Sequence, residues 1–220
     1  MREHSLISAR PVPVFVVGMR RSGTSMMNNI IRLLPGAVMM FEPRDLWWSV
    51  TQGHLERFKD CPAAVQPAFA FDIFMEGGGI RGAKFALDPG VGAFYWRHLR
   101  DQSERCGRFV DPAFVFIRRN FKDTYASYIQ LDGGSVQGTV SEDIHHYFWD
   151  RLYLDFEAHI EMHPARAVLV EYENILEDPM AALRPVWDLL GASPDSTKLN
   201  DMIRRPEHTA GIQNHEMAEL

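Results

Sequence analysis

The sequence predicts an α/β fold of three layers, in which helices cover both faces of a central parallel sheet. Three short apolar runs, at residues 14–17, 114–117 and 168–170, have the composition of strands that are buried on both faces. A segment with the apolar spacing of a helix follows each run. Strands that alternate with helices along a chain pair in parallel, because each crossover returns the chain to the same end of the sheet.

The helices that follow these strands have recognisable ends. Pro35 and Gly36 end the first helix, and we expect Asp123 to cap the second. A single helix is predicted between Asp178, a good N-cap that is followed by proline, and Gly191, which fits the position just past a helix end. Its apolar face is made of Met180, Leu183, Trp187 and Leu190.

Two further stretches complete the predicted architecture. Residues 139–163 have helical spacing, with Thr139 and Glu142 placed as a capping box and an apolar face of Leu152, Phe156 and Ile160. Residues 66–92 are rich in glycine and phenylalanine, so we expect a loop with short elements there.

Length and composition indicate a soluble protein. We expect one domain over residues 1–220, since a chain of this length can bury a sizeable core. The formal net charge of −6 argues against a broad nucleic-acid surface, although a local basic pocket remains compatible with it. No stretch approaches the ~20 apolar residues of a membrane span, and we predict a cytoplasmic location with no membrane partner. Cys61 and Cys106 form no CxxC pair, so neither a zinc site nor a disulfide framework is indicated.

The loop after the first strand carries the clearest chemical signal. Residues 18–25 have the glycine spacing of a P-loop, which wraps backbone N–H groups around a phosphate at a helix N-terminus. Nucleotide triphosphatases place a lysine where this chain has Thr24, and here the cations come earlier, at Arg20 and Arg21. The loop therefore predicts a nucleotide-binding fold of the P-loop type, with a ligand whose phosphate-linked leaving group is held by guanidinium donors.

The loop also resembles a known family. Its run from Arg21 to Ser25, Arg-Ser-Gly-Thr-Ser, is similar to the 5′-phosphosulfate loop of the sulfotransferases that use 3′-phosphoadenosine-5′-phosphosulfate (PAPS). The resemblance implies that Arg21 contacts the 5′-phosphate and the bridging oxygen of PAPS. The donor-binding residues that it implies in this loop are Arg20, Arg21, Ser22, Gly23, Thr24 and Ser25.

A second motif follows the strand at residues 114–117. Arg119 lies at the strand end and Ser127 eight residues later, about two helical turns along, so both side chains can face one anion. The pair resembles the family's 3′-phosphate motif. Arg118 is an alternative to Arg119, but its side chain should point to the opposite face of the strand.

Tyr172 follows the third strand, in a segment that resembles the family's Tyr-Glu-Asp-Leu segment. The resemblance places this tyrosine near the adenine, and a core tyrosine is the alternative. Because ligands of parallel sheets bind at the carboxyl ends of the strands, Gly18, Arg119 and Tyr172 are predicted to meet in one cleft.

Sulfuryl transfer requires positive charge on the oxygens in transit and a base for the proton of the acceptor. We assign the charge to Arg21, with Lys84 as a helper, and we expect no metal because arginines supply it. We assign the base to Glu42, which ends a short apolar run; carbohydrate and protein-tyrosine sulfotransferases carry a glutamate at about this place. The alternatives are an ion pair of Glu42 with Arg44 or Arg20, and a histidine base. The candidate histidines are His54, His145 and His146.

Three departures separate the chain from the cytosolic phenol and steroid sulfotransferases. Ala86 stands where those enzymes have a catalytic histidine, two residues after the lysine. Met26 stands where they place a tryptophan against the adenine, and Arg204 and Arg205 only faintly resemble the C-terminal segment that grips the 3′-phosphate. The chain is thus closer to the bacterial, carbohydrate and tyrosylprotein types.

The acceptor is predicted to be a small molecule or a carbohydrate, and Trp47 and Trp48 are candidates for its pocket. Neither its identity nor the oligomeric state follows from the sequence. Two other functions stay open. A P-loop small-molecule kinase would explain the first loop but not Arg119 with Ser127, and a non-catalytic nucleotide-binding module would agree with Ala86.

Overall fold

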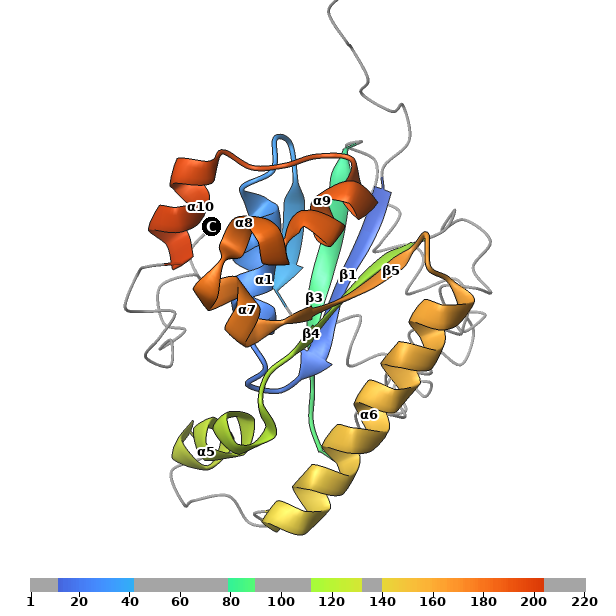
Figure 1. Cartoon of the computed structure of the whole chain (residues 1–220), viewed down its shortest axis with the longest axis vertical. Coiled ribbons are helices and arrows are strands. Elements are labelled where there is room, and N and C mark those ends of the chain that lie inside the picture. Colours follow the sequence, from blue (N-terminus) through green and yellow to red (C-terminus); the bar gives the residue numbers. More distant parts are fainter. Residues whose placement is uncertain (1–11, 42–78, 90–111, 132–139, 204–220) are drawn as a thin grey trace, which may run out of the picture.

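The computed structural model describes residues 12–41, 79–89, 112–131 and 140–203 (Figure 1). Five parallel strands form one sheet in the order β2-β3-β1-β4-β5. They are β1 (Val12–Met19), β2 (Val38–Phe41), β3 (Ile80–Leu87), β4 (Ala113–Arg118) and β5 (Ala167–Glu171). The predicted α/β class with a central parallel sheet is confirmed.

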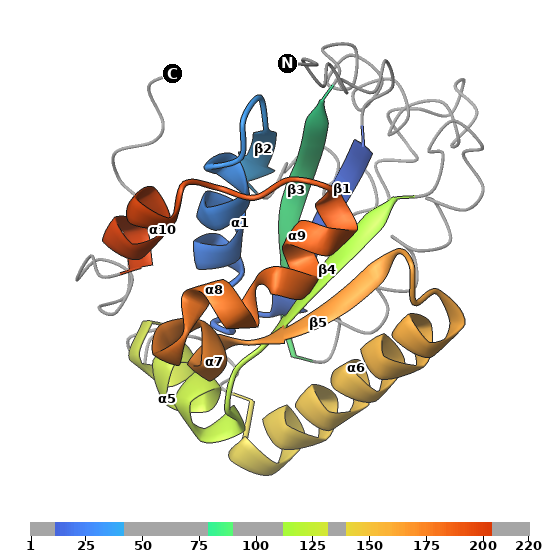
Figure 2. The same cartoon turned by 45° about the horizontal axis from the view of Figure 1, so that its top comes forward.

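Helices lie on both faces of the sheet, and Figure 2 shows the layers from a second direction. One face is covered by α1 (Thr24–Arg32), α7 (Tyr172–Glu177), α8 (Pro179–Ala182), α9 (Arg184–Leu190) and α10 (Ser196–Ile203). The other face is covered by α6 (Glu142–Met162). The remaining helix, α5 (Phe121–Leu131), lies beyond the carboxyl end of β4.

Alternation along β1 builds a separate core on each side of the sheet. Val14 and Val16 pack into the core that the sheet shares with α1, α9 and α10. Phe15 and Val17 pack into the core beneath α6. Burial on both faces explains why β1 and β4 have continuous apolar runs rather than alternating apolar and polar residues.

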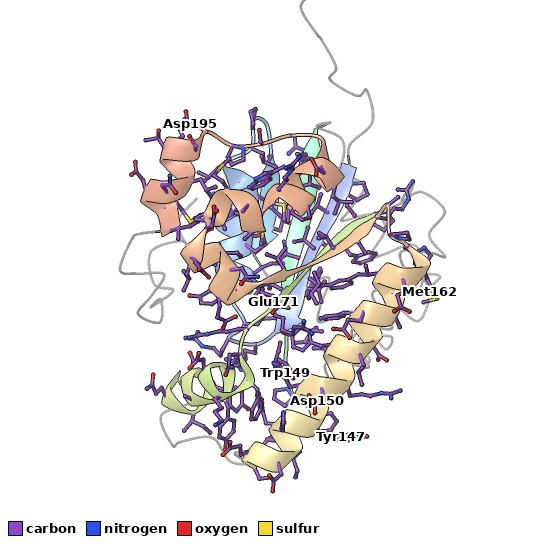
Figure 3. The ribbon with its side chains drawn as sticks, viewed as in Figure 1. Tyr147, Trp149, Asp150, Met162, Glu171 and Asp195 are labelled. Carbon is purple, nitrogen blue, oxygen red and sulfur yellow. The ribbon has the colours of Figure 1, made fainter. Side chains whose placement is uncertain are left out.

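The outer side of α6 faces away from the sheet. Tyr147 and Met162 project from it, and their side chains are 65% and 62% exposed (Figure 3). On the inner side, the rings of Phe116 and Phe156 stack with their centroids 4.1 Å apart. The predicted apolar face of this helix is confirmed, with Leu152 and Phe156 buried and Ile160 partly buried.

The structure corrects the prediction for residues 66–92. The described part contains β3, an eight-residue strand that lies inside the sheet between β2 and β1. Arg81, Gly82 and Lys84 interrupt its apolar pattern, so the strand was not recognisable as a buried one. Gly82 is required by close approach, because a Cβ there would meet the Val14 carbonyl oxygen and would lie 2.9 Å from the Met39 sulfur.

The predicted start of α5 was also wrong. The helix begins at Phe121, so Asp123 lies inside the first turn and does not cap it. The cap is Asn120, whose Oδ1 accepts a hydrogen bond of 2.9 Å from the Lys122 N–H. Asn120 and Asp123 are both residue types that cap helices. Because β4 ends at Arg118, the helix begins early enough for Asn120 to be the cap.

The start of α6 differs from its prediction in a similar way. Its N-cap is Ser141, whose Oγ accepts from the Ile144 N–H at 3.4 Å. Thr139, the predicted member of a capping box, lies outside the described residues.

The helix predicted from Asp178 to Gly191 is two short helices. The N-cap is confirmed, since the Asp178 carboxylate accepts from the Ala181 N–H at 3.1 Å. The break falls at Leu183, because Pro185 has no N–H to donate to the preceding turn. The break also leaves Met180 41% exposed, whereas Leu183, Trp187 and Leu190 are buried as predicted.

The end of α9 is confirmed at Gly191, whose φ of 64° is in the left-handed region typical of the position after a helix. Among the residues that the structure describes, no helix has the length and apolar character to cross a membrane.

Replacement of Gly82 by alanine should destabilise the fold by about 3 kcal/mol or more, because the new methyl group would meet backbone that cannot move aside. Gly36→Ala is the matched control. Gly36 has a φ of 71° but open space around it, so only the cost of the left-handed backbone, about 1 kcal/mol, is expected. Urea unfolding of both variants measures the difference, and equal losses would contradict the packing described for β3.

Candidate functional site

The turn between β1 and α1 is held in an unusual backbone conformation. Arg21 has a φ of 75° and Gly23 a φ of 100°. A left-handed non-glycine residue is uncommon and costs free energy, so the surrounding contacts must stabilise it. Two of them are backbone hydrogen bonds, from the Ser22 N–H to the Met19 carbonyl at 3.0 Å and from the Arg20 N–H to the Leu87 carbonyl at 2.8 Å.

The first turn of α1 is open to an anion. Its N-cap, Gly23, has no side chain to accept from the free N–H groups of the first turn, and that turn contains no acidic residue. Free N–H groups and the positive end of the helix dipole together favour a bound phosphate. Thr24, which begins the helix, and Ser22 before it are both buried against the sheet.

Two glycines let the turn pack against the ends of the neighbouring strands. A Cβ on Gly18 would lie 2.5 Å from Ser22 Oγ and 2.7 Å from the Ile117 carbonyl oxygen. A Cβ on Gly23 would lie 2.5 Å from Cδ2 of Tyr172. The turn therefore touches the ends of both β4 and β5, which only glycine at these two positions permits.

Arg21 joins the two predicted phosphate motifs directly. Its Nε donates a hydrogen bond of 2.9 Å to the Ser127 hydroxyl on α5, 106 residues further along the chain. Arg119 donates a longer bond of 3.4 Å from a terminal nitrogen to the Arg21 carbonyl oxygen, and its guanidinium carbon lies 4.8 Å from the centre of the Tyr172 ring. The predicted convergence of the three strand ends is confirmed.

Arg119 keeps one donor without a partner. Its Nε is buried and makes no hydrogen bond, as far as the described residues go. A buried cationic donor that lacks an acceptor is unfavourable, and an anion beside it would remove this cost. The side chain is thus poised for an anionic ligand on the same side of the protein as the β1–α1 turn.

Lys84 brings a third cation to the turn. The side chain is only 3% exposed, and its Nζ donates a hydrogen bond of 2.8 Å to the hydroxyl of Ser25. Arg20 pairs with Asp88 at 3.1 Å, and both side chains are nearly half exposed, so this ion pair is weak. Met26, which takes the place of the family's tryptophan, is buried in the core.

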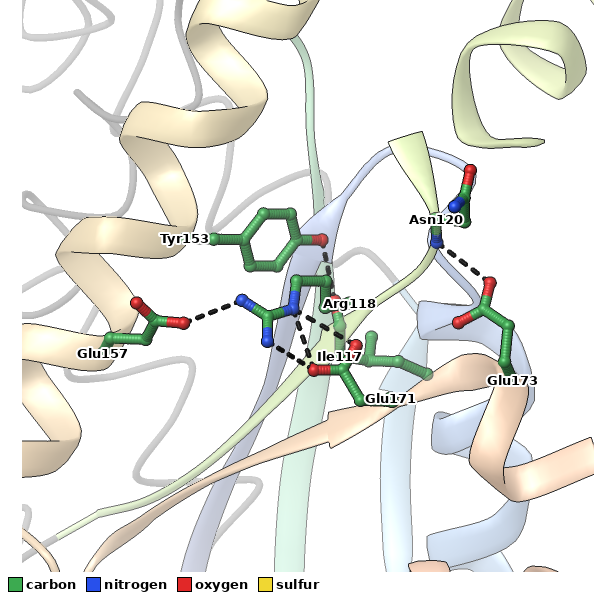
Figure 4. A network of polar contacts seen from close by, with 7 residues as sticks. All are labelled: Ile117, Arg118, Asn120, Tyr153, Glu157, Glu171 and Glu173. Atoms are coloured by element: carbon green, nitrogen blue, oxygen red, sulfur yellow. Dashed lines mark hydrogen bonds and ion pairs between the residues drawn. The ribbon is translucent and has the colours of Figure 1, made fainter. Parts of the chain in front are cut away.

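Arg118 points to the other face of the sheet, as predicted. Its Nε donates at 2.8 Å to Glu171, the last residue of β5, and its NH1 donates at 2.7 Å to Glu157 on α6 (Figure 4). Hydrogen bonds to Glu171 raise the pKa of Arg118 above its already high ordinary value. The side chains of the two neighbouring arginines therefore lie on opposite faces of the sheet. Arg118 binds carboxylates of the protein, and Arg119 faces the β1–α1 turn.

Two histidines of α6, His145 and His146, lie at its interface with α5. His145 is fully buried, with its ring 5.7, 5.3 and 5.1 Å from the rings of Phe121, Tyr125 and Tyr128. Burial, with a smaller contribution from nearby His146, lowers the pKa of His145 to about 4. This makes it a weak base at neutral pH.

His146 is half exposed, stacks on Phe121 at 4.2 Å and lies 3.7 Å from Asp150. Both histidines thus have packing roles between the two helices.

Several predicted residues lie outside the described ranges. They are Glu42, His54, Trp47, Trp48, Arg204 and Arg205. The last described residue before Glu42 is Phe41, which is the register partner of Lys84. No group of three or more His, Cys, Asp or Glu side chains that could hold a metal ion occurs within the described part of the chain.

The sequence reasoning missed Tyr153. This residue of α6 is 2% exposed, and its hydroxyl donates to the Ile117 carbonyl at 2.9 Å and accepts from the Met19 N–H at 3.4 Å. The position of a tyrosine on an otherwise apolar helix face could have indicated this contact, because a buried hydroxyl requires a polar partner.

Comparison with known families agrees with this geometry. A sequence model described as "Sulfotransferase family" matches residues 107–196, a range that includes Arg119, Ser127 and Tyr172 but not the β1–α1 turn. The resemblance to the sulfotransferase family is confirmed. The search of curated proteins found no match to the chain.

Solved sulfotransferase structures share the fold. A mouse sulfotransferase, SULT7A1, complexed with PAP, is 17% identical over 89% of this chain, with a TM-score of 0.55. The chain covers 63% of that protein's length, which is less than two thirds.

Two bacterial structures are similar to the chain at comparable levels. The sulfotransferase domain of the Synechococcus PCC 7002 olefin synthase is 16% identical, with 93% of this chain and 80% of that domain covered and a TM-score of 0.58. A sulfotransferase from Alicyclobacillus acidocaldarius is also 16% identical, with coverages of 88% and 89% and a TM-score of 0.53. At these identities the similarity concerns the sulfotransferase fold alone.

The buried histidine predicts a pH dependence of stability. The pKa of His145 is about 4 in the folded protein, against about 6.5 unfolded, so the unfolded chain binds the extra proton between these values. The stabilisation is complete above pH 6.5 and is lost as the pH falls toward 4, by about 2–3 kcal/mol. His145→Phe should remove this part of the slope in urea unfolding measured from pH 7.5 to 4.5, and an unchanged slope would contradict the assignment.

Proposed function

We propose that this protein is a sulfotransferase that transfers the sulfuryl group of PAPS to an acceptor hydroxyl, with a sulfate ester and adenosine 3′,5′-bisphosphate as products. The observation that carries the proposal is the contact between the two motifs, in which Arg21 bonds to Ser127 and Arg119 bonds to the Arg21 backbone. Two groups of anion-binding donors at this spacing suit a nucleotide with phosphates at both ends of its ribose.

The 5′ end of the donor would lie on the β1–α1 turn. The N–H groups at the start of α1 and the hydroxyls of Thr24 and Ser25 are the donors for its phosphate. Arg21 and Lys84 supply the positive charge, and the 2.8 Å bond from Lys84 to Ser25 places the ammonium beside this turn.

The 3′ end would lie between Arg119 and Ser127. Among the described residues the Nε of Arg119 has no acceptor, so it would donate to the 3′-phosphate. The Ser127 hydroxyl would exchange its bond with Arg21 for one with the phosphate. The Tyr172 ring packs against the Arg119 guanidinium and, by the resemblance to the sulfotransferases, would lie near the adenine. A related fold in mouse was determined as a complex with PAP, which is the nucleotide that this reaction would release.

In the proposed reaction the acceptor oxygen attacks sulfur in line, and the bond from sulfur to the bridging oxygen breaks. The proton of the acceptor passes to the carboxylate of Glu42, and the bond electrons leave on the 5′-phosphate, where Arg21 stabilises them. β2 ends at Phe41, which is the register partner of Lys84, and Glu42 is the next residue in the sequence.

The alternatives have less support. A P-loop kinase would leave the contact between Arg21 and Ser127 without a role, and Thr24 stands where a kinase of this type has its lysine. A non-catalytic nucleotide-binding module agrees with Ala86 in place of histidine. We expect a small-molecule or carbohydrate acceptor and a cytoplasmic enzyme, both of which remain predictions.

Binding of adenosine 3′,5′-bisphosphate tests the donor site. Arg21→Ala and Arg119→Ala should each weaken binding about 10- to 100-fold by calorimetry, because each removes a charged hydrogen-bond donor. Arg184→Ala, an exposed arginine on α9, is the matched control and should bind normally. Absence of binding to the wild type, or equal binding by all three variants, would end the PAPS proposal.

Glu42→Gln tests the base. Transfer of radiolabelled sulfate from PAPS to a panel of hydroxyl acceptors should fall at least 100-fold, because the amide cannot accept the proton. The affinity for adenosine 3′,5′-bisphosphate should change less than threefold. Full turnover by this variant would exclude Glu42 as the base, and no turnover by the wild type on any acceptor would favour the non-catalytic module.

A further inference from the structure

Tyr153 lies on the inner face of α6, directly beneath the candidate site. Its ring packs 4.7 Å from Trp149 and 5.4 Å from Phe156, and the Arg118 guanidinium lies 5.7 Å from its centre. The hydroxyl reaches the sheet between β1 and β4, where it donates to the Ile117 carbonyl (Figure 4). It also accepts from the Met19 N–H.

These two backbone groups belong to the strand ends that carry the two phosphate motifs. Met19 is the last residue of β1 and directly precedes Arg20 and Arg21, and Ile117 is two residues before Arg119. The ladder between β1 and β4 ends at the pair of Val17 and Phe116. Past that pair, the Tyr153 hydroxyl contacts both strands through Ile117 of β4 and Met19 of β1.

The hydroxyl keeps its proton. Burial raises the pKa of Tyr153 well above its ordinary value, so the group is both donor and acceptor at any ordinary pH. Arg118 adds support from the same side, since it joins Glu157 on α6 to Glu171 at the end of β5. α6 is thus attached to the ends of three strands at the level of the site.

We infer that Tyr153 is a positioning residue that sets the distance between the two anion-binding motifs. It touches no ligand itself and acts through Met19 and Ile117. The inference rests on the proposed nucleotide site: a ligand that carries phosphates at both ends gains affinity from the second phosphate only if both motifs are held at the right separation.

The gain from the second phosphate is the quantity to measure. Adenosine 5′-phosphate engages the β1–α1 turn alone, and adenosine 3′,5′-bisphosphate engages both motifs. The ratio of their dissociation constants, determined by calorimetry, reports the alignment of the motifs, whereas a general loss of stability would weaken both ligands alike.

In Tyr153→Phe the ratio should fall about tenfold, mainly through weaker binding of the bisphosphate, while binding of adenosine 5′-phosphate changes less than threefold. Tyr147→Phe is the matched control, because this exposed tyrosine of the same helix also loses only a hydroxyl. Its ratio should equal that of the wild type.

A second variant covers the case in which Tyr153→Phe does not fold. Arg118→Lys keeps the charge between the two glutamates but loses the forked geometry that packs on the Tyr153 ring, so its ratio should fall about threefold. An unchanged ratio in the folded variant overturns the positioning role. Failure of the wild type to bind the bisphosphate overturns the nucleotide site itself, and this inference with it.

Discussion

The hydrogen bond between Arg21 and Ser127 is the contact on which the rest of the site depends. It joins the turn after β1 to the helix after β4, over a separation of 106 residues. It can form because β1 and β4 are neighbours in a parallel sheet, so their carboxyl ends lie side by side. A sheet in which another strand separated these two would place the motifs too far apart for one small ligand.

The strand order concentrates cations in a protein whose overall charge is negative. Arg21 and Arg119 follow the ends of β1 and β4, and Lys84 lies within β3 beside β1, whereas the formal net charge of the chain is −6. Arg118 would add to the repulsion, but Glu157 and Glu171 neutralise it on the other face of the sheet. Within the described ranges no carboxylate neutralises Arg119, and its buried Nε has no hydrogen-bond acceptor, which favours an anion from solution.

Much of the fold could be predicted because buried parallel strands leave a strong pattern. β1, β4 and β5 appear as apolar runs, and the glycines of the first turn mark positions where a side chain would not fit. β3 could not be predicted, because Lys84 and Gly82 interrupt its apolar pattern. Both residues make contacts with other elements, and these contacts are visible only in the folded structure. The apolar pattern of a strand reflects how its residues pack within that strand. Gly82 and Lys84 are instead determined by contacts with other elements, which such a pattern does not contain.

The same limit applies to the site. Arg119 and Ser127 were found from their resemblance to the 3′-phosphate motif of the sulfotransferases, with which their spacing across one strand end and the following helix agrees. Tyr153 was missed, since its hydroxyl bonds to backbone of β1 and β4 and no spacing within α6 reveals a partner there. The sequence analysis also predicted Asp123 as the cap of α5, whereas the structure has Asn120 in this role.

A crystal structure with adenosine 3′,5′-bisphosphate bound tests the central claim most directly. The account predicts one nucleotide that bridges the two motifs, with its 5′-phosphate on the N–H groups at the start of α1 and its 3′-phosphate between Arg119 and Ser127. The direct bond from Arg21 to Ser127 should be broken in that complex. A nucleotide bound elsewhere, or one whose 3′-phosphate points away from Arg119, would contradict the account.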